Sequence, residues 1–436
     1  MRVPDRFMST AERPIHHLCR ISSPFTSPRM TRSALLSVTL ILGALTAFAP
    51  MSIDMYLPGL PTLGREFHAE AGTVELTLTA FFVALALSQL LYGPFADRFG
   101  RKAPLYVGLI LYVVASVACA LAPDIYTLIG MRFLQASGGC AGIVIARAVV
   151  RDLFESREAA RMFSLMMLVM GSAPILAPIA GGYLLVWVGW RSIFWVLAGF
   201  GVLCLLGVAV WLPETRRHDA RTSDGVLGAA ARYARLLRDR AFVGYALAGG
   251  FAQAGMFAYI AGSPSVFIDF FGLSATAYGW LFGANALGLI ASSQINRRLL
   301  AHGSATRILS RANTINACVG LVLAAIAATG LDGLAGILLP LFCYLTSLGF
   351  IFPNSAALAL AEQGQRAGIA SALFGTLTYS GATISSMLVA RLHNGGPVPM
   401  TVVIAGCGVL AWGAGRFIVP AGTQPRVSVG EPVDIE

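Results

Sequence analysis

The sequence contains few charged side chains, and this scarcity excludes most soluble proteins. Only 12% of the 436 residues are charged, whereas 56% are hydrophobic. The mean hydropathy is +0.73. A soluble domain of this length needs a more polar surface. The composition therefore indicates an integral membrane protein.

Patterns typical of enzymes and metal sites are also missing. The seven cysteines are scattered without a Cys-x-x-Cys pair, which argues against disulfides and a metal site. No glycine-rich phosphate loop, no cluster of metal ligands and no Ser/His/Asp constellation stands out in the sequence. We expect no enzymatic activity, no cofactor and no metal. These absences disfavour the alternative of a membrane enzyme or receptor.

The net charge of +10 does not indicate nucleic-acid binding, because the sequence offers no folded polar domain with a basic face. Arginine and lysine instead concentrate in the N-terminal tail and in every second loop between apolar runs. Basic loops stay on the cytoplasmic side of a membrane. The distribution therefore predicts that both termini are cytoplasmic.

Apolar runs of about 20 residues, long enough to cross about 30 Å of hydrocarbon, predict transmembrane helices. Twelve such runs occur. Their approximate bounds are 35–60, 74–93, 104–121, 126–146, 162–186, 193–212, 242–267, 278–295, 306–328, 333–352, 369–390 and 400–419.

The spans divide the chain into two equal halves, which implies an internal duplication. The expected organisation is a disordered basic tail (1–33), a six-helix bundle (34–212), a cytoplasmic linker (213–241), a second six-helix bundle (242–419) and a C-terminal tail (420–436). Basic residues within the linker predict a short helix, either solvated or lying on the inner membrane surface. The stretch MTRSALL makes Met30 a candidate translation start, and the choice between Met1 and Met30 stays open.

The second loop carries an ordered pattern, GPFADRFGRK. Gly93 and Gly100 predict a tight turn between two spans, and Asp97 is placed to interact with the start of the next helix. Basic residues hold the loop inside and offer partners to carboxylates of neighbouring spans. The corresponding loop of the second half, NRRLLAHG, lacks the aspartate.

GPFADRFGRK resembles the loop signature between the second and third spans of the major facilitator superfamily. This resemblance implies an all-α integral membrane fold, with twelve transmembrane helices in two six-helix bundles around a central cavity. It also implies that the loop takes part in the switch between inward-open and outward-open states. The residues that carry this expectation are Gly93, Asp97, Arg98, Gly100, Arg101 and Lys102.

Two further patterns narrow the class. In the fourth span, RFLQASGGCAG resembles the Arg-xx-Gln-Gly element of proton-coupled facilitators, although Ala136 replaces the glycine. In the fifth span, GSAPILAPIAGGYL resembles the antiporter motif of drug exporters, and ordinary packing of a proline-kinked helix is the alternative. The motif residues, expected to share one helix face, are Gly171, Pro174, Pro178, Gly181 and Gly182.

Together with SIDMYLPGLP, VVRDLF, WRSIFW and AGMFAYIAGSPSVF, these patterns resemble the bicyclomycin-resistance (Bcr/CflA) family of drug:proton antiporters over residues 50–419. The resemblance implies a monomeric exporter of drugs or other small amphipathic compounds in the bacterial inner membrane. Its partners are then the substrate, protons and the lipid bilayer. The alternative on the same fold is a proton-coupled metabolite transporter.

Asp54 interrupts the first apolar span. An intramembrane charge costs about 2.5 to 3.5 kcal/mol on insertion scales, so such residues usually face the bundle interior and carry function. Asp54 and Arg132 are both expected about 9 Å from the outer ends of their spans, where they can meet. We predict that Asp54, Arg132 and Gln135 form the proton-coupling site. The alternative is a permanent ion pair that joins helices. Glu75 and Asp269 are expected nearer the outer ends of their spans.

Candidates for the substrate cavity lie in the seventh span. They combine polarizable, aromatic and hydrogen-bonding groups, a mixture suited to varied amphipathic molecules. Packing against a neighbouring helix is the alternative. The candidates are Gln253, Met256, Phe257 and Tyr259.

Overall fold

The described residues form helices joined by short turns. The computed structural model describes residues 32–154, 156–215, 226–330, 333–363 and 367–420, and no strand occurs among them. The helices are α1 (Arg32–Thr46), α2 (Phe48–Asp54), η1 (Leu57–Gly59), α3 (Leu60–Glu66), α4 (Ala71–Phe99), α5 (Lys102–Ala120), α6 (Ile125–Leu153), α7 (Ser156–Trp187), α8 (Arg191–Trp211), α9 (Val226–Leu236), α10 (Arg240–Pro264), η3 (Ser265–Phe270), α11 (Ala275–Leu300), α12 (Ala305–Thr329), α13 (Gly333–Leu360), α14 (Ala367–Leu392), α15 (Val398–Gly413) and η5 (Ala414–Ile418).

The helix lengths confirm an all-α membrane fold. Within the described ranges, ten helices are long and apolar enough to cross a membrane, and a bent pair formed by Ser37–Thr46 and Phe48–Glu66 makes eleven. The remaining predicted span lies in α11, which is not among them. Its 26 residues correspond to about 39 Å of helix, so α11 is nevertheless long enough to cross a bilayer.

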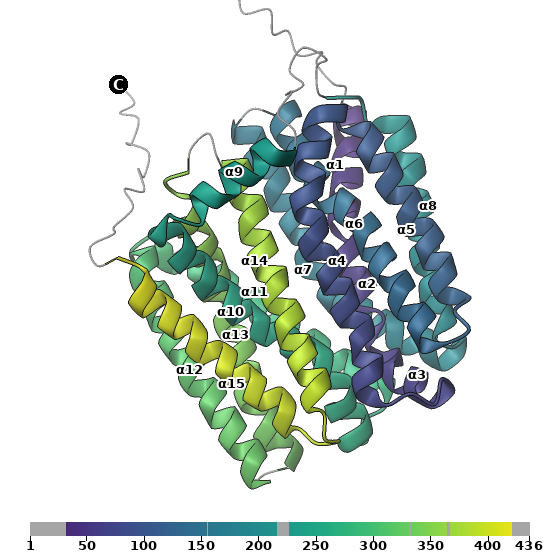
Figure 1. Cartoon of the computed structure of the whole chain (residues 1–436), viewed down its shortest axis with the longest axis vertical. Helices are drawn as coiled ribbons and strands as arrows, with labels where there is room; N and C mark the ends of the chain where they lie inside the picture. The colour runs from purple at the N-terminus through teal and green to yellow at the C-terminus, as the bar shows by residue number, and fades with distance from the viewer. Residues whose placement is uncertain (1–31, 155, 216–225, 331–332, 364–366, 421–436) are drawn as a thin grey trace, which may run out of the picture.

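The helices gather into two bundles, α1–α8 and α10–α15, joined through α9 (Figure 1). Two long pairs hold the bundles together: α4 packs along α14, and α7 packs along α11. Helix α9 lies within the predicted linker and contacts both α4 and α14. We call this side of the molecule the α9 end and the opposite side, where α3 meets η3, the η3 end. Residues 1–31, 216–225 and 421–436, which include most of the predicted tails and part of the linker, lie outside the described residues.

The first predicted span is broken rather than continuous. Its two parts meet at an angle of 42° next to Ala47. Pro50 lies four residues after Thr46, and a proline removes the hydrogen bond to the carbonyl four residues earlier and clashes with it. The break is therefore encoded by Pro50, and it leaves Asp54 at the end of the short helix α2.

Glycines of α7 bring two other segments unusually close. A Cβ built at Gly181 would overlap the backbone oxygen of Met55, directly after Asp54. A Cβ at Gly182 would lie 2.8 Å from the oxygen of Ala275 in α11. The five motif residues therefore do not share one face, because Gly181 faces the first span and Gly182 faces the other bundle.

We expect Gly181→Val to lower the melting temperature of the purified protein, because the added carbons must displace the backbone at Met55. Such overpacking costs about 1 to 3 kcal/mol. Gly199→Val in α8 is the matched control, since no atom lies within 4 Å of a Cβ at Gly199. Equal melting temperatures for the two variants would contradict the tight α7 contact.

Candidate functional site

Asp54 faces the opposite bundle. Its side chain is buried, with 4% of its surface exposed, and no hydrogen bond or ion pair joins its carboxylate to another described residue. The carboxylate lies within electrostatic range of three tyrosine hydroxyls, those of Tyr259, Tyr278 and Tyr379. These tyrosines belong to α10, α11 and α14. The buried carboxylate therefore lies where the two bundles meet.

Arg132 does not pair with Asp54, contrary to the expectation that the two side chains meet. Its guanidinium lies 4.6 Å from the ring centroid of Tyr56 and 4.3 Å from that of Phe81. Tyr56 comes two residues after Asp54, about 200° around a helix. Arg132 and Asp54 consequently lie on opposite sides of the first span.

A short chain of buried hydrogen bonds satisfies one nitrogen of the Arg132 guanidinium. Its Nη1 donates to Gln135 Oε1 at 2.6 Å, and Gln135 Nε2 donates to Ser116 Oγ at 2.8 Å. Nε and Nη2 of Arg132 have no hydrogen-bond partner among the described residues. The guanidinium of Arg132 is thus a fully buried cation that contacts aromatic faces. It makes no ion pair with a carboxylate of the described residues.

The seventh-span candidates separate into two pairs. Gln253 and Met256 are partly exposed, and Gln253 Nε2 lies 3.5 Å from Met256 Sδ. Phe257 and Tyr259 are buried. The Phe257 ring centroid lies 4.8 Å from that of Phe82 in α4, so Phe257 joins the two bundles.

Tyr259 packs within its own bundle. Its hydroxyl accepts a hydrogen bond from Asn285 Nδ2 at 3.1 Å, and its ring stacks on Phe282 at 5.3 Å. Phe257 and Tyr259 therefore make packing contacts in this structure, as the alternative reading of the seventh span expected.

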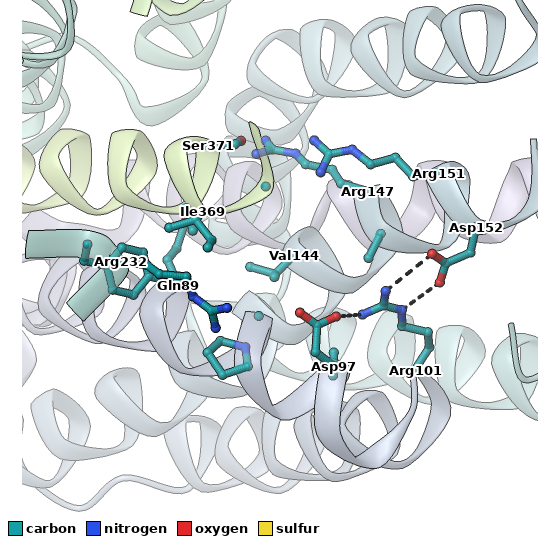
Figure 2. Close-up of a pocket in the computed structure, with 17 residues that line it drawn as sticks. Gln89, Asp97, Arg101, Val144, Arg147, Arg151, Asp152, Arg232, Ile369 and Ser371 are labelled. Carbon is teal, nitrogen blue, oxygen red and sulfur yellow. Dashed lines mark hydrogen bonds and ion pairs between the residues drawn. The ribbon is translucent and has the colours of Figure 1, made fainter. Parts of the chain in front are cut away.

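The loop after α4 is organised around Arg101. Its Nη1 lies 2.9 Å from Asp97 Oδ1, and its Nε lies 2.8 Å from Asp152 Oδ2 at the end of α6 (Figure 2). Glu214 Oε1 and Oε2 accept the backbone N–H groups of Arg101 and Lys102. Burial lowers the pKa of Arg101, but the carboxylates of Asp152 and Asp97 outweigh burial and raise it.

Only part of the predicted turn lies between helices. Gly100 has φ of 88°, a conformation that favours glycine, and it ends α4. Gly93 instead lies inside α4 and lines a cavity. Arg98 is in the last turn of α4, and Lys102 begins α5.

Glu75 forms a contact between the bundles that the sequence did not indicate. Only 3% of its surface is exposed, so it is as buried as Asp54 despite its position near a span end. Its Oε1 lies 3.6 Å from His393 Nδ1, just beyond α14, and 3.4 Å from Ser265 Oγ in η3. Hydrogen bonding to Glu75 raises the pKa of His393 against the opposing effect of burial, and the charge of Asp269 adds to the rise.

Comparisons with known proteins agree with this geometry. The model of the Major Facilitator Superfamily matches residues 42–386. The chain is 38% identical over 375 residues to an uncharacterized MFS-type transporter, YdgK of Bacillus subtilis, covering 85% of this chain and 92% of that protein. It is 29% identical to a bicyclomycin resistance protein homolog of Haemophilus influenzae, covering 89% and 97%. The solved D-xylose-proton symporter matches with a TM-score of 0.68 at 16% identity, covering 89% and 98%.

The Glu75–His393 contact predicts a pH dependence of stability. Because the folded-state pKa of His393 is raised, its stabilising contribution is fully present below the unfolded value of about 6.5 and is lost as pH rises through the folded-state pKa. We expect His393→Gln to flatten this decline in the melting temperature between about pH 5 and pH 9. His302→Gln, at an exposed histidine, is the control. An unchanged pH profile in His393→Gln would rule out the contact.

Proposed function

The chain belongs to the Major Facilitator Superfamily, and we propose that it exports drugs or other small amphipathic compounds in exchange for protons. It is a multi-pass membrane transporter. The match to a bicyclomycin resistance protein homolog supports a drug as substrate. One observation carries the proton coupling: Asp54 is a carboxylate buried between the bundles without a partner among the described residues.

Asp54 takes up and releases the proton in the proposed mechanism. An ionised carboxylate buried without a partner is costly, and a bound proton removes that cost. When the bundles separate, water reaches the carboxylate and the proton can leave. Because Tyr259, Tyr278 and Tyr379 come from the other bundle, relative movement of the bundles changes the environment of Asp54 directly.

Arg132 has a supporting role in this mechanism. Its bond to Gln135 and its place against Tyr56 hold a permanent positive charge near the segment that carries Asp54. The Asp97–Arg101–Asp152 cluster lies within one bundle and stabilises the conformation described here. If these ion pairs break in another conformation of the transporter, the loop from Gly93 to Lys102 acts as a conformational switch.

We assign the α9 end to the cytoplasm of a bacterial cell and the η3 end to the outside. The basic residues Arg98, Arg151 and Arg298 lie at the α9 end, as expected for cytoplasmic loops. The protein then acts as a monomer in the inner membrane, with both termini cytoplasmic.

The orientation is tested by reporters fused at each end of the molecule. A phosphatase that is active only outside the cytoplasm should be inactive after Arg238 and active after Ala122. The reverse pattern contradicts the assignment. A fluorescent protein that matures only inside, fused at the same two sites, is the control and must give the complementary result.

We expect Asp54→Asn to abolish export driven by a pH gradient in liposomes while the protein still inserts and binds drug. Asparagine keeps the shape and hydrogen bonding of aspartate but cannot be deprotonated. The transported compound is chosen first, by a susceptibility panel in a host without its own exporters. Asp124→Asn, at an exposed helix N-cap, is the matched control and should transport normally.

Drug-induced proton release from the purified protein separates coupling from simple folding defects. Wild-type protein should release protons on binding drug, and Asp54→Asn should not. Normal gradient-driven export by Asp54→Asn would show that Asp54 is structural. Glu75, equally buried, would then be the next carboxylate to test.

A further inference from the structure

A cavity of about 310 Å³ opens between the bundles at the α9 end. It is lined by α4, α6, α9 and the first turns of α14 (Figure 2). The lining contains four guanidinium groups but only two carboxylates. The cavity therefore carries an excess of positive charge, and its volume is near the lower end of the range for small-molecule sites.

The two carboxylates of the cavity pair with Arg101 and not with the arginines that lie toward α14. Asp97 and Asp152 both bind Arg101. Arg147 and Arg151 of α6 line the same cavity, and neither makes a hydrogen bond or an ion pair with a described residue. In Figure 2 their side chains lie away from the Asp97–Arg101–Asp152 cluster, on the same side of the view as Ser371.

Arg147 and Arg151 also repel each other. They are four residues apart on one helix, a spacing at which like charges destabilise the helix. Basic residues that only hold a loop inside the cell can extend into solvent, as exposed Arg298 does. Arg147 is instead partly buried in the cavity, within electrostatic range of Tyr379. Holding a loop on the cytoplasmic side does not require Arg147 to lie between the bundles, so its position needs another explanation.

We propose that this cavity binds an anionic group, a carboxylate or a phosphate, between Arg147 and Arg151. Guanidinium groups bind such anions through paired N–H donors. Ser371 adds a hydroxyl from the other bundle. Arg151 reaches that bundle, because its Nη1 would lie 3.5 Å from a Cβ at Gly368. A bound anion would relieve the repulsion between the two arginines and link α6 to α14. This site does not depend on proton coupling at Asp54.

The test uses the purified full chain in neutral detergent and inorganic phosphate as the probe, at constant ionic strength. Isothermal titration calorimetry should show saturable binding of phosphate to the wild-type protein. Arg147→Gln and Arg151→Gln should each weaken the affinity for phosphate about tenfold, the loss expected for one charge-assisted interaction. Arg298→Gln, at an exposed arginine of the same end, is the matched control and should bind as the wild type does.

Arg147→Lys separates lost binding from a folding defect. It keeps the positive charge without the paired N–H donors, so it should still bind phosphate, but more weakly than the wild type. Equal phosphate affinity in the wild type and in both glutamine variants would overturn the proposal, as would the absence of saturable binding. Neither result bears on export, because the assay needs neither drug nor a proton gradient.

The source of the anion is identified by repeating the titration in two kinds of vesicle. If phosphatidylglycerol vesicles suppress phosphate binding and phosphatidylcholine vesicles do not, a lipid headgroup occupies the site. If binding is the same in both, the ligand is a soluble acid. Both outcomes support an anion site.

Discussion

The contact of α7 with two backbone segments determines where Asp54 lies. Gly181 lets α7 touch the backbone at Met55, and Gly182 lets the same helix touch α11 of the other bundle. Any side chain at these positions would push the segments apart. Asp54 is therefore held between the bundles by close packing, and not by a bond to its own carboxylate. The carboxylate consequently makes no hydrogen bond or ion pair with another described residue.

Asp54 and Arg132, two of the buried charged residues of the first bundle, are kept apart by the shape of the first span. The break at Pro50 ends α2 at Asp54, and the segment that follows presents Tyr56 to Arg132. Aromatic faces stabilise a cation without neutralising it. The bundle thus holds a buried guanidinium on one side of the span and, on the other, a buried carboxylate that makes no ion pair with a described residue, as the proposed proton exchange at Asp54 requires.

The sequence predicted the helices and the deep carboxylate because both depend on local composition. Long apolar runs require helices in a membrane, and a single aspartate in such a run is conspicuous. Pairing of distant residues was not predictable in this way. Arg101 binds Asp152, 51 residues later, and its backbone binds Glu214, 113 residues later. The meeting of Asp54 with Arg132 was predicted from depth alone and is wrong for this structure, because depth does not say which side of a helix a residue occupies. Glu75 lies near the end of its span, as expected, but its burial was not predictable from that position, because the other bundle covers this end.

Helix α4 contacts the second bundle near both of its ends and between them. Its contacts with that bundle run from Glu75 at one end, through the ring of Phe82 on Phe257, to the cavity beside Asp97 at the other. The Phe82 ring meets that of Phe257 edge-on between these two ends. Glu75 lies seven residues before Phe82, about 10 Å, and Asp97 lies fifteen residues after it, about 22 Å. A rigid tilt of α4 about Phe82 that opened the η3 end by a given distance would therefore move the α9 end about twice as far in the opposite direction. In such a tilt, a small displacement at the Glu75–His393 contact would accompany a larger one at the cavity end of the same helix.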